Sequence, residues 1–388
     1  MPAATLAPMR RRLRVALLVE TSNGYARNLL RGVIGYMREH HAWSIFLSEH
    51  GRGEAPPAWL GRWQGDGIIA RIENQDIAKA VQAARVPAVD VSSARLVPDL
   101  PWVETDDVAI ARLACDHLRE RGFRRFAFCG DARFQWSTWR QEAFVGALRA
   151  LGHDCAVFPT RRKEEPDREL ARLGAWIAAL PKPVGLMACY DLRGRQVLDA
   201  CREAEIAVPD EVAVVGVDDD ELICELCDPP LTSVQPEAVR TGYEAARLLD
   251  GLMSGTDPRE RTVRVPPRGV ATRRSSEVLA IDDAEISALV RFIRDNACDG
   301  IDVGTLLLRT RLTRRVLENR FKALFGHTPH EQILRVKLAR VKELLRDTDL
   351  PLTAIAERSG FIHAEYLSVV FKKKAGMTPS AFRDQRIG

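Results

Sequence analysis

The pattern of hydrophobic and polar positions changes once along the chain, near residue 270. Before that point, short apolar runs alternate with stretches whose apolar residues recur at helical spacing. These repeated strand–helix units predict parallel sheets flanked by helices. The predicted strands cover residues 14–20, 43–49, 66–72 and 86–92, then 123–130, 155–159, 184–190 and 211–219.

The stretches between these strands predict amphipathic helices. In residues 26–40, for example, Leu29, Val33 and Met37 repeat at helical spacing. The whole body, residues 14–270, is long for one sheet, because domains most often have about 100–150 residues. The sequence therefore predicts two α/β lobes with a cleft between them. Further helices are predicted at residues 76–85, 106–122, 139–152, around Trp176 and at 193–204.

Beyond the body the chain reads as helical only. Residues 271–281 lose the earlier periodicity and are predicted to be a linker, followed by a domain at 282–388. That domain shows two helices with a tight break, one long helix, and a second pair of helices. These three parts correspond to residues 303–326, 330–348 and 352–376.

Two segments of this domain read almost alike at an offset of 50 residues: RFKALFGHTP at 320–329 and VFKKKAGMTP at 370–379. Each ends a predicted second helix at a glycine. A single pair of this kind also fits a plain helical bundle, but two copies favour tandem helix-turn-helix units that read successive major grooves. The predicted buried stripes are Leu317, Phe321 and Leu324 in the first copy and Leu367, Val370 and Phe371 in the second.

The charge is distributed unevenly, although the chain as a whole carries only +4. Residues 303–388 hold 17 Lys and Arg against 8 Asp and Glu, a net charge of +9, whereas the rest of the chain has a net charge of −5. A basic domain on a mildly acidic body indicates that the helical domain binds a polyanion. Together with the paired helices, this charge predicts binding to double-stranded DNA.

The composition excludes some other classes. The hydrophobic fraction of 46% and the charged fraction of 28% are ordinary for a globular protein. No apolar run reaches the roughly 18 residues of a membrane span, and the basic N-terminal tail, 1–13, lacks the order of a signal peptide. We expect a cytoplasmic protein. Its eight cysteines read mostly as small core residues, and the C-x-x-C of Cys224 and Cys227 lacks further ligands, so no metal or cofactor is expected.

The segment LPLTAIAERSGFIHAEYLSVVFKKKAGMTPSAFR, residues 350–383, resembles the signature region of AraC-type transcription regulators. The resemblance extends over residues 286–386. It implies that the second helix of each unit reads base edges and that lysines near its end contact phosphates. Ala364 and Val369 are apolar, so we expect the first unit to supply more of the specificity. The implied base readers are Arg314, Arg315, Glu318 and Asn319, then His363, Ala364, Glu365 and Ser368, with Lys372, Lys373 and Lys374 on phosphates.

Residues 14–270 resemble the ligand-binding core of LacI-type repressors, which is similar to periplasmic sugar-binding proteins. Residues 1–13 are too short to hold the DNA-binding domain that usually precedes this core, so we expect the helical domain at 282–388 to read DNA instead. The segments that carry the resemblance are VETDDVAIARLACDHLRERGFRRFAFCG, YDLRGRQVL, VPDEVAVVGVDDDEL and LTSVQPE.

A LacI-like sensor followed by an AraC-like reader is similar to the bacterial xylose operon regulators. This resemblance implies a transcription activator that binds an operator and D-xylose or a related sugar, forms a homodimer and assists RNA polymerase. A regulator of the same architecture for another carbohydrate, or a repressor, stays open as an alternative. A solute-binding component of a transporter is disfavoured by the DNA-binding domain.

The resemblance also places a sugar site on particular residues. Carboxylates after strand ends accept from sugar hydroxyls, a guanidinium donates to them, and tryptophan covers an apolar sugar face. Asp218 also fits a helix cap, and either tryptophan fits the core. The implied sugar-binding residues are Arg140, Asp191, Asp218, Trp136 and Trp139, with Asn23 and Tyr25 from the first lobe.

An enzymatic body is the remaining alternative. Cys129, in FCGDARF, has the strand-to-helix placement of a nucleophile in some AraC-type proteins with amidotransferase-like bodies. No G-x-S-x-G or G-x-C-x-G elbow surrounds it, and no glycine-rich phosphate loop is present. We therefore expect no catalytic activity.

Overall fold

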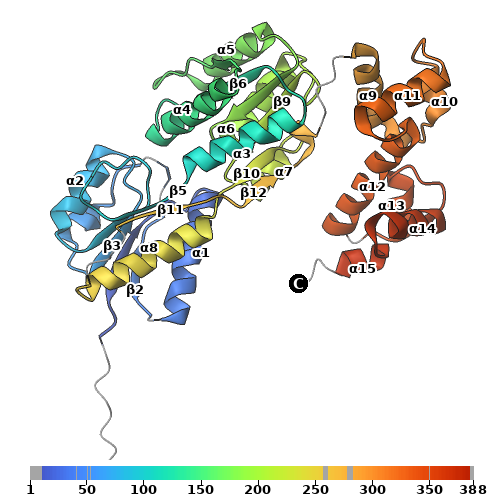
Figure 1. Cartoon of the computed structure of the whole chain (residues 1–388). Helices are drawn as coiled ribbons and strands as arrows, with labels where there is room; N and C mark the ends of the chain where they lie inside the picture. Colours follow the sequence, from blue (N-terminus) through green and yellow to red (C-terminus); the bar gives the residue numbers. More distant parts are fainter. Residues whose placement is uncertain are drawn as a thin grey trace, which may run out of the picture. The chain divides into compact units, whose positions relative to one another are not determined.

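The structure is a computed structural model, and the chain forms two compact units, Met1–Leu279 and Ala280–Gly388 (Figure 1). Residues 1–10 of the predicted N-terminal tail, 1–13, lie outside the described residues. The structure describes residues 11–40, 42–49, 51–52, 54–256, 261–277, 283–348 and 350–384.

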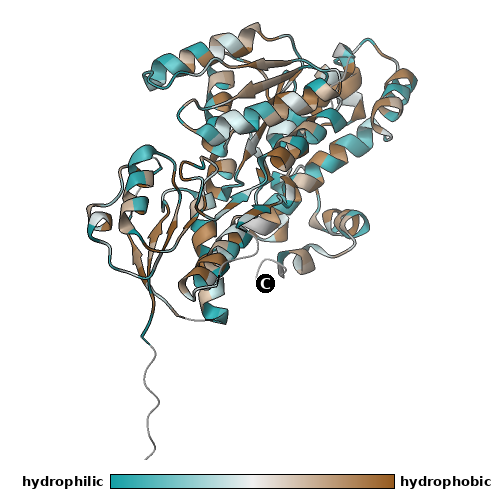
Figure 2. Cartoon of the chain, turned by 60° about the vertical axis from the view of Figure 1, so that its left-hand side comes forward, coloured by the Kyte–Doolittle hydropathy of each residue, from teal (hydrophilic) through white to brown (hydrophobic). Residues whose placement is uncertain are grey.

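The first lobe is built on a parallel sheet of six strands among the described residues, in the order β11-β5-β4-β3-β1-β2. Val15 and Leu17 of β1 face a core shared with helices α1 and α8, whereas Ala16 and Leu18 face the core on the α2 side. Both faces of the inner strands are therefore buried, and the strands are brown in Figure 2. The elements are β1 Arg14–Leu18, α1 Gly24–Glu39, β2 Ser44–Leu47, β3 Gly67–Ala70, α2 Gln75–Ala84, β4 Ala88–Asp90, β5 Trp102–Thr105, α8 Ala238–Met253 and β11 Thr262–Val265.

The second lobe repeats this plan with a sheet in the order β12-β10-β9-β8-β6-β7. All its neighbouring strands are parallel except β12, which runs antiparallel to β10. The elements are α3 Asp107–Glu120, β6 Phe126–Cys129, α4 Gln135–Ala150, β7 Cys155–Val157, α5 Pro166–Ala179, β8 Val184–Ala188, α6 Asp191–Glu203, β9 Val212–Val217, α7 Glu221–Leu226, β10 Thr232–Gln235 and β12 Gly269–Ala271.

The chain passes from one sheet to the other after β5, β10 and β11. The predicted pair of α/β lobes is thus confirmed, but each lobe is assembled from separate segments of the chain. The hydropathy pattern missed β5, β10, β11 and β12, because strands of three or four residues are too short to show alternation.

Helices α1 and α8 approach each other closely through two glycines. A Cβ atom on Gly32 would collide with the carbonyl oxygen of Val239, and one on Gly242 with that of Leu29. Glycine is therefore required at both positions, since a side chain would separate the helices. This contact joins the start of the first lobe to a segment that returns to it late in the chain.

The predicted linker, 271–281, begins too early. Ala271 belongs to β12, and Ser275 and Ser276 lie in a short turn, Arg274–Ser276, where both are fully buried. Ser275 Oγ donates to Val214 O at 2.7 Å and accepts from Thr232 N at 2.8 Å. The segment up to residue 277 is therefore part of the second lobe, and residues 278–281 lie outside the described residues.

The second unit contains two small hydrophobic cores joined by one helix. The long helix α12 supplies Ile333 to the first core and Leu338 and Val341 to the second, as its periodicity predicted. The two predicted helix pairs are confirmed as α10 with α11 and α13 with α14. The helices are α9 Ala284–Asn296, α10 Val303–Leu307, α11 Arg314–Phe325, α12 Pro329–Asp347, α13 Leu352–Arg358, α14 Ala364–Ala375 and α15 Pro379–Asp384.

The glycines of the repeated segment end the second helix of each pair. Gly326 and Gly376 adopt positive φ angles of 73° and 77°, and their N–H groups donate back into the last turn. One predicted core position is wrong: Leu324 is 41% exposed, and Phe325 contacts the core instead. The stripe spacing alone does not decide burial at a helix end, where the neighbouring residue can turn inward.

Candidate functional site

A small cavity lies between the two lobes of the first unit. Its volume is about 30 Å³, room for about two water molecules, because one needs roughly 10–15 Å³ of such volume. A monosaccharide therefore fits only after side chains at the cavity move. The lining residues are Tyr25, Arg52, Arg71, Val91, Ser93, Glu104, Thr105, Trp136, Arg140 and Asp218.

The strands explain why these side chains meet. Asp218 directly follows β9, Arg71 directly follows β3, and Thr105 is the last residue of β5. The carboxyl ends of parallel strands form the usual ligand site of open α/β folds. The cavity therefore lies where the sequence predicted a sugar site.

Four residues predicted from the sequence line this cavity: Tyr25, Trp136, Arg140 and Asp218. Asp218 has a φ of 112°, which is rare for a residue other than glycine. Burial raises the pKa of its carboxyl group above the ordinary value, although Arg52 and Arg140 act against this rise. Backbone strain of this kind is retained where the surroundings hold it, as in ligand sites.

Arg140 is held rigidly by its neighbours. Its Nε and Nη2 donate to Asp107 Oδ1 at 2.9 and 2.6 Å, and its Nη1 donates to Cys189 O. The guanidinium also lies 5.1 Å from the centroid of the Trp136 ring. These contacts orient a donor group toward the cavity in advance, which reduces the entropy lost when a ligand binds.

The other three predicted residues do not line the cavity. Asp191 is 2% exposed and accepts hydrogen bonds from Ser233 and from the backbone of Asp220. Asn23 caps helix α1, and its Oδ1 accepts from Ala26 N at 2.9 Å. Trp139 lies 5.1 Å from the guanidinium of Arg95, which also lies over Trp102. All three therefore support the walls of the cleft.

The sequence reasoning missed a buried charge cluster in the first lobe. Arg71 donates to Glu20 at 3.1 Å and to Glu73 at 2.6 Å, and its guanidinium lies over the ring of Tyr25. Burial alone would lower the pKa of Arg71, but Glu20 and Glu73 raise it above its ordinary value. The guanidinium therefore stays charged inside the lobe.

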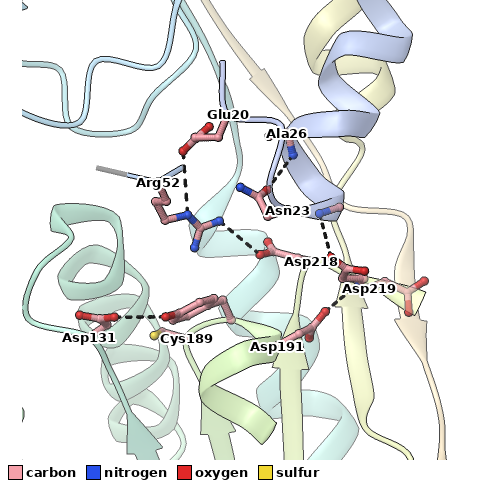
Figure 3. A network of polar contacts seen from close by, with 12 residues as sticks. Glu20, Asn23, Ala26, Arg52, Asp131, Cys189, Asp191, Asp218 and Asp219 are labelled. Carbon is pink, nitrogen blue, oxygen red and sulfur yellow. Dashed lines mark hydrogen bonds and ion pairs between the residues drawn. The ribbon is translucent and has the colours of Figure 1, made fainter. Parts of the chain in front are cut away.

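Arg52 is a second missed residue, and it spans the cleft. Its side chain is directed between Glu20 of the first lobe and Asp218 of the second, at 3.9 Å from each (Figure 3). The guanidinium also lies 5.0 to 5.6 Å from three aromatic rings of the second lobe. These rings belong to Phe134, Trp136 and Tyr190. Arg52 therefore takes up much of the space at the aromatic wall.

One buried oxygen of a residue that lines the cavity, Glu104 Oε2, has no hydrogen-bond donor among the described residues. Burial raises the pKa of Glu104, while Arg95 opposes this effect. A buried acceptor without a donor is costly unless a ligand or water supplies one. Hydroxyl groups of a sugar are suitable donors.

The body offers little for covalent chemistry. Cys129 is fully buried, and burial raises the pKa of its thiol to about 11, so the reactive thiolate does not form near neutral pH. Burial likewise raises the pKa of Cys227 to about 11. In the described ranges, no group of three or more His, Cys, Asp or Glu is arranged to hold a metal ion.

The first helix-turn-helix pair presents polar residues on α11. Arg314, Arg315 and Asn319 are exposed, and Glu318 is half-buried, with its carboxylate 3.6 Å from Arg314. The side opposite these residues is anchored by Leu317 and other core residues. All four predicted base readers of this helix are therefore available to a groove.

The second pair presents a different surface on α14. His363 and Glu365 are exposed, Ala364 is half-buried, and Ser368 Oγ donates to the backbone oxygen of Ala364 at 3.0 Å. The three predicted phosphate contacts, Lys372, Lys373 and Lys374, are exposed in the last turn. The two helices thus share a backbone plan and differ in chemistry.

A two-lobed ligand-binding body joined to tandem helix-turn-helix pairs defines a class of protein: a sugar-responsive, DNA-binding transcription regulator. Family models agree with each part of the chain. A model described as XylR N-terminal domain matches residues 14–108, a periplasmic binding protein-like domain matches 115–276, and a helix-turn-helix domain matches 306–385. The chain belongs to the family of xylose operon regulatory proteins.

The similarity to this family extends over nearly the whole chain. The xylose operon regulatory protein of Haemophilus influenzae is 31% identical over 95% of this chain and 98% of its own length. That of Escherichia coli strain K12 is 32% identical over 96% of this chain and 97% of its own. A solved structure of the xylose-binding transcription activator XylR matches with a TM-score of 0.80 at 32% identity, covering 97% of this chain and 98% of that one.

Proposed function

We propose that this regulator is a transcription activator that responds to D-xylose. The relatives named for xylose operons, and a solved relative described as a xylose-binding activator, support this assignment. The family resemblance further supports a homodimer that assists RNA polymerase at an operator. The described helices are all too short or too polar to span a membrane, and a regulator that binds DNA would act in the cytoplasm.

The cavity between the lobes carries the proposal. Its wall combines Trp136, which suits the apolar face of a sugar ring, with carboxylates that accept from hydroxyls. Asp218 from one lobe and Glu104 from the other face this space. A small polyol would supply the missing donor to the buried Glu104 Oε2.

The charges favour a neutral sugar over a sugar acid. Each arginine at the cavity already faces at least one carboxylate: Arg52 faces Glu20 and Asp218, and Arg140 binds Asp107. Arg71 likewise binds Glu20 and Glu73. An anionic ligand would have to compete with these internal carboxylates, whereas hydroxyl groups would donate to them.

The mechanism follows from the two-lobed body. A sugar that contacts both lobes shifts the population toward the arrangement in which it binds more tightly. The second lobe holds the chain just before the DNA-binding unit, because His117 Nε2 lies 2.8 Å from Ser276 Oγ and Arg121 donates to Ser276 O. Movement of that lobe would therefore be transmitted to the start of the linker.

The test is calorimetric titration of the full-length protein with D-xylose, L-arabinose, D-ribose, D-glucose and D-xylonate. We expect D-xylose to bind most tightly and D-xylonate to bind weakly. Asp218→Asn should remove sugar binding, whereas Asp116→Asn, a matched change at an exposed carboxylate of α3, should not. Preference for D-xylonate would overturn the neutral-sugar assignment, and no heat with any sugar would overturn sugar sensing.

A further inference from the structure

Helices α11 and α14 occupy equivalent positions in their units, so their residues can be compared pairwise. In each helix two residues spaced four apart are fully buried, Leu317 and Phe321 in α11 and Leu367 and Phe371 in α14. Each helix ends at a glycine whose N–H donates to a lysine carbonyl four residues earlier. Every position of α11 therefore corresponds to the position 50 residues later in α14.

The buried residues also fix which positions point outward. An α-helix has about 3.6 residues per turn, so residues two positions before and after a buried one lie on the opposite side. In α11 these outward positions are Arg315 and Asn319, and in α14 they are Glu365 and Val369. Where the first helix carries an amide that can pair with adenine, the second carries an apolar side chain.

Val369 is part of an exposed apolar stripe. It is 67% exposed, Tyr366 is 56% exposed, and Ile362, just before the helix, is 90% exposed. Tyr366 and Val369, three residues apart, lie along one side of the helix, and Ile362 precedes its N-cap, His363. An apolar stripe on a small basic domain is unfavourable in water and indicates that something covers it.

Glu365 is exposed at the start of α14 and can make a polar base contact, whereas the stripe is the candidate for apolar base contacts. The hydroxyl proton of Ser368 is directed to the carbonyl of Ala364, so this side chain offers only an acceptor. Ala364 offers a methyl group. Lys372, Lys373 and Lys374 continue the same helix and are exposed, which matches the negative charge of the phosphates beside a groove.

We propose that α14 reads thymine through its exposed apolar stripe, with Val369 contacting the C5-methyl group in the major groove. Thymine is the base that presents a methyl group there. The proposal rests on the proposed DNA-binding function and reverses one expectation from the sequence, because it makes the second helix a specificity element as well as a phosphate contact. Charge favours DNA over a protein partner, since the stripe lies beside three lysines.

The test begins with duplex DNA selected by the full-length wild-type protein from a random library. Arg315→Ala should relax the sequence preference in the half of the motif that α11 reads, which identifies the other half as the α14 site. Each thymine in that half is then replaced by deoxyuridine, a change that removes only the methyl group. We expect at least one replacement to weaken wild-type binding roughly threefold to fivefold, the size expected for one buried methyl group.

Val369→Ala, combined with the deoxyuridine replacement, completes a double-mutant cycle between this side chain and the methyl group. The variant should bind the thymine duplex as weakly as the wild type binds the deoxyuridine duplex, and it should no longer distinguish the two. Because Val369 is exposed, the change should leave folding intact. Val239→Ala, the same change at an exposed position of α8, should keep the full wild-type response to deoxyuridine.

Three results would count against the proposal. Wild-type binding could tolerate every deoxyuridine, or the loss could persist unchanged in Val369→Ala; either result overturns methyl readout. If Val369→Ala instead alters the oligomeric state and spares DNA affinity, the stripe is a contact between copies of the chain. Failure to select any sequence has a different meaning, because it overturns sequence-specific DNA binding itself.

Discussion

Asp191 accepts a hydrogen bond from the backbone N–H of Asp220 at 2.8 Å, and it thereby holds the turn that carries Asp218. Its other oxygen accepts from Ser233 Oγ at 2.6 Å. Asp218, in contrast, faces the cavity. Two carboxylates that follow neighbouring strands therefore have different roles: one positions the turn, and the other is available to the ligand.

Replacement of these two residues should separate the roles. Asp191→Ala leaves the hydroxyl of Ser233 and the N–H of Asp220 without a buried acceptor, so we expect it to lower the free energy of unfolding by about 2–4 kcal/mol. Asp218→Ala should abolish the rise in Tm caused by D-xylose and cost far less stability. Thermal unfolding with and without the sugar measures both effects; equal destabilisation by the two variants would contradict this division.

Arg71 should be essential to the stability of the first lobe. Arg71→Met leaves the buried Glu73 without its hydrogen-bonded cation and Glu20 with only Arg52 at 3.9 Å, and loss of one partner of a buried ion pair costs about 3–5 kcal/mol. Urea unfolding of the full chain measures the change. Adding Glu20→Gln to the variant should restore part of the loss, because it removes one of the two carboxylate charges that lose Arg71.

An exposed arginine provides the matched control for this experiment. Arg202 binds Asp199 at 2.8 Å, and the side chains are 61% and 26% exposed. Arg202→Met should therefore cost less than about 1 kcal/mol, as is usual for a surface ion pair. Similar losses of unfolding free energy at the two positions would show that burial does not make the ion pairs of Arg71 more stabilising than a surface pair.

The sequence predicted the fold well where signals are local. Glycines at helix ends and buried stripes identified both helix pairs, and the residue after β9 was recognised as a ligand candidate. In the first lobe, however, Glu20 and Arg71 were read as the ends of predicted strands. Periodicity reports which residues are apolar; it does not report which polar strand ends converge, because that depends on strand order.

Arg52 marks a second limit of sequence reasoning. It lies in the segment between β2 and β3, where no periodic pattern exists, and its neighbours in the cleft come from distant parts of the chain. Asp191 shows the opposite case. It has the right local position for a ligand, but tertiary contacts with Ser233 and Asp220 occupy both of its oxygens.

Asp90 should make the stability of the first lobe depend on pH. Burial raises the pKa of its carboxyl group to about 7, against about 3.9 in an unfolded chain. Between these values the folded state binds a proton that the unfolded state has lost, so stability falls as pH rises through this window. The loss is at most about 1.4 kcal/mol per pH unit for one proton.

Asp90→Asn should remove this contribution. The amide oxygen can still accept from Ser92 N, which lies 2.8 Å from Asp90 Oδ1. Urea unfolding of both proteins at several pH values gives the difference between their free energies of unfolding. The contributions of other titrating groups such as His117 cancel in this difference. The wild type should lose stability relative to the variant as pH rises from about 4 to 7, and parallel curves would rule out a titrating Asp90.

The two kinds of predicted DNA contact should respond differently to mutation. Arg315→Ala should weaken binding to the selected operator by about 1–3 kcal/mol and weaken binding to random DNA far less, since arginine pairs with guanine edges. Lys373→Ala should weaken binding to both DNAs about equally and reduce the salt slope by about 1. Binding measured over a range of salt concentrations distinguishes these cases; equal losses for Arg315→Ala on both DNAs would make it a phosphate contact.

Ser275 should couple sugar binding to DNA binding, because it fixes the end of the body to the second lobe. Ser275→Ala leaves Val214 O and Thr232 N without a partner, which should cost about 1–3 kcal/mol of stability. Ser275 does not line the cavity, so affinity for D-xylose should be retained while the effect of the sugar on operator affinity decreases. Ser254→Ala, at the exposed end of α8, should change neither quantity. If D-xylose alters operator affinity equally in Ser275→Ala and the wild type, the anchored segment does not transmit the signal.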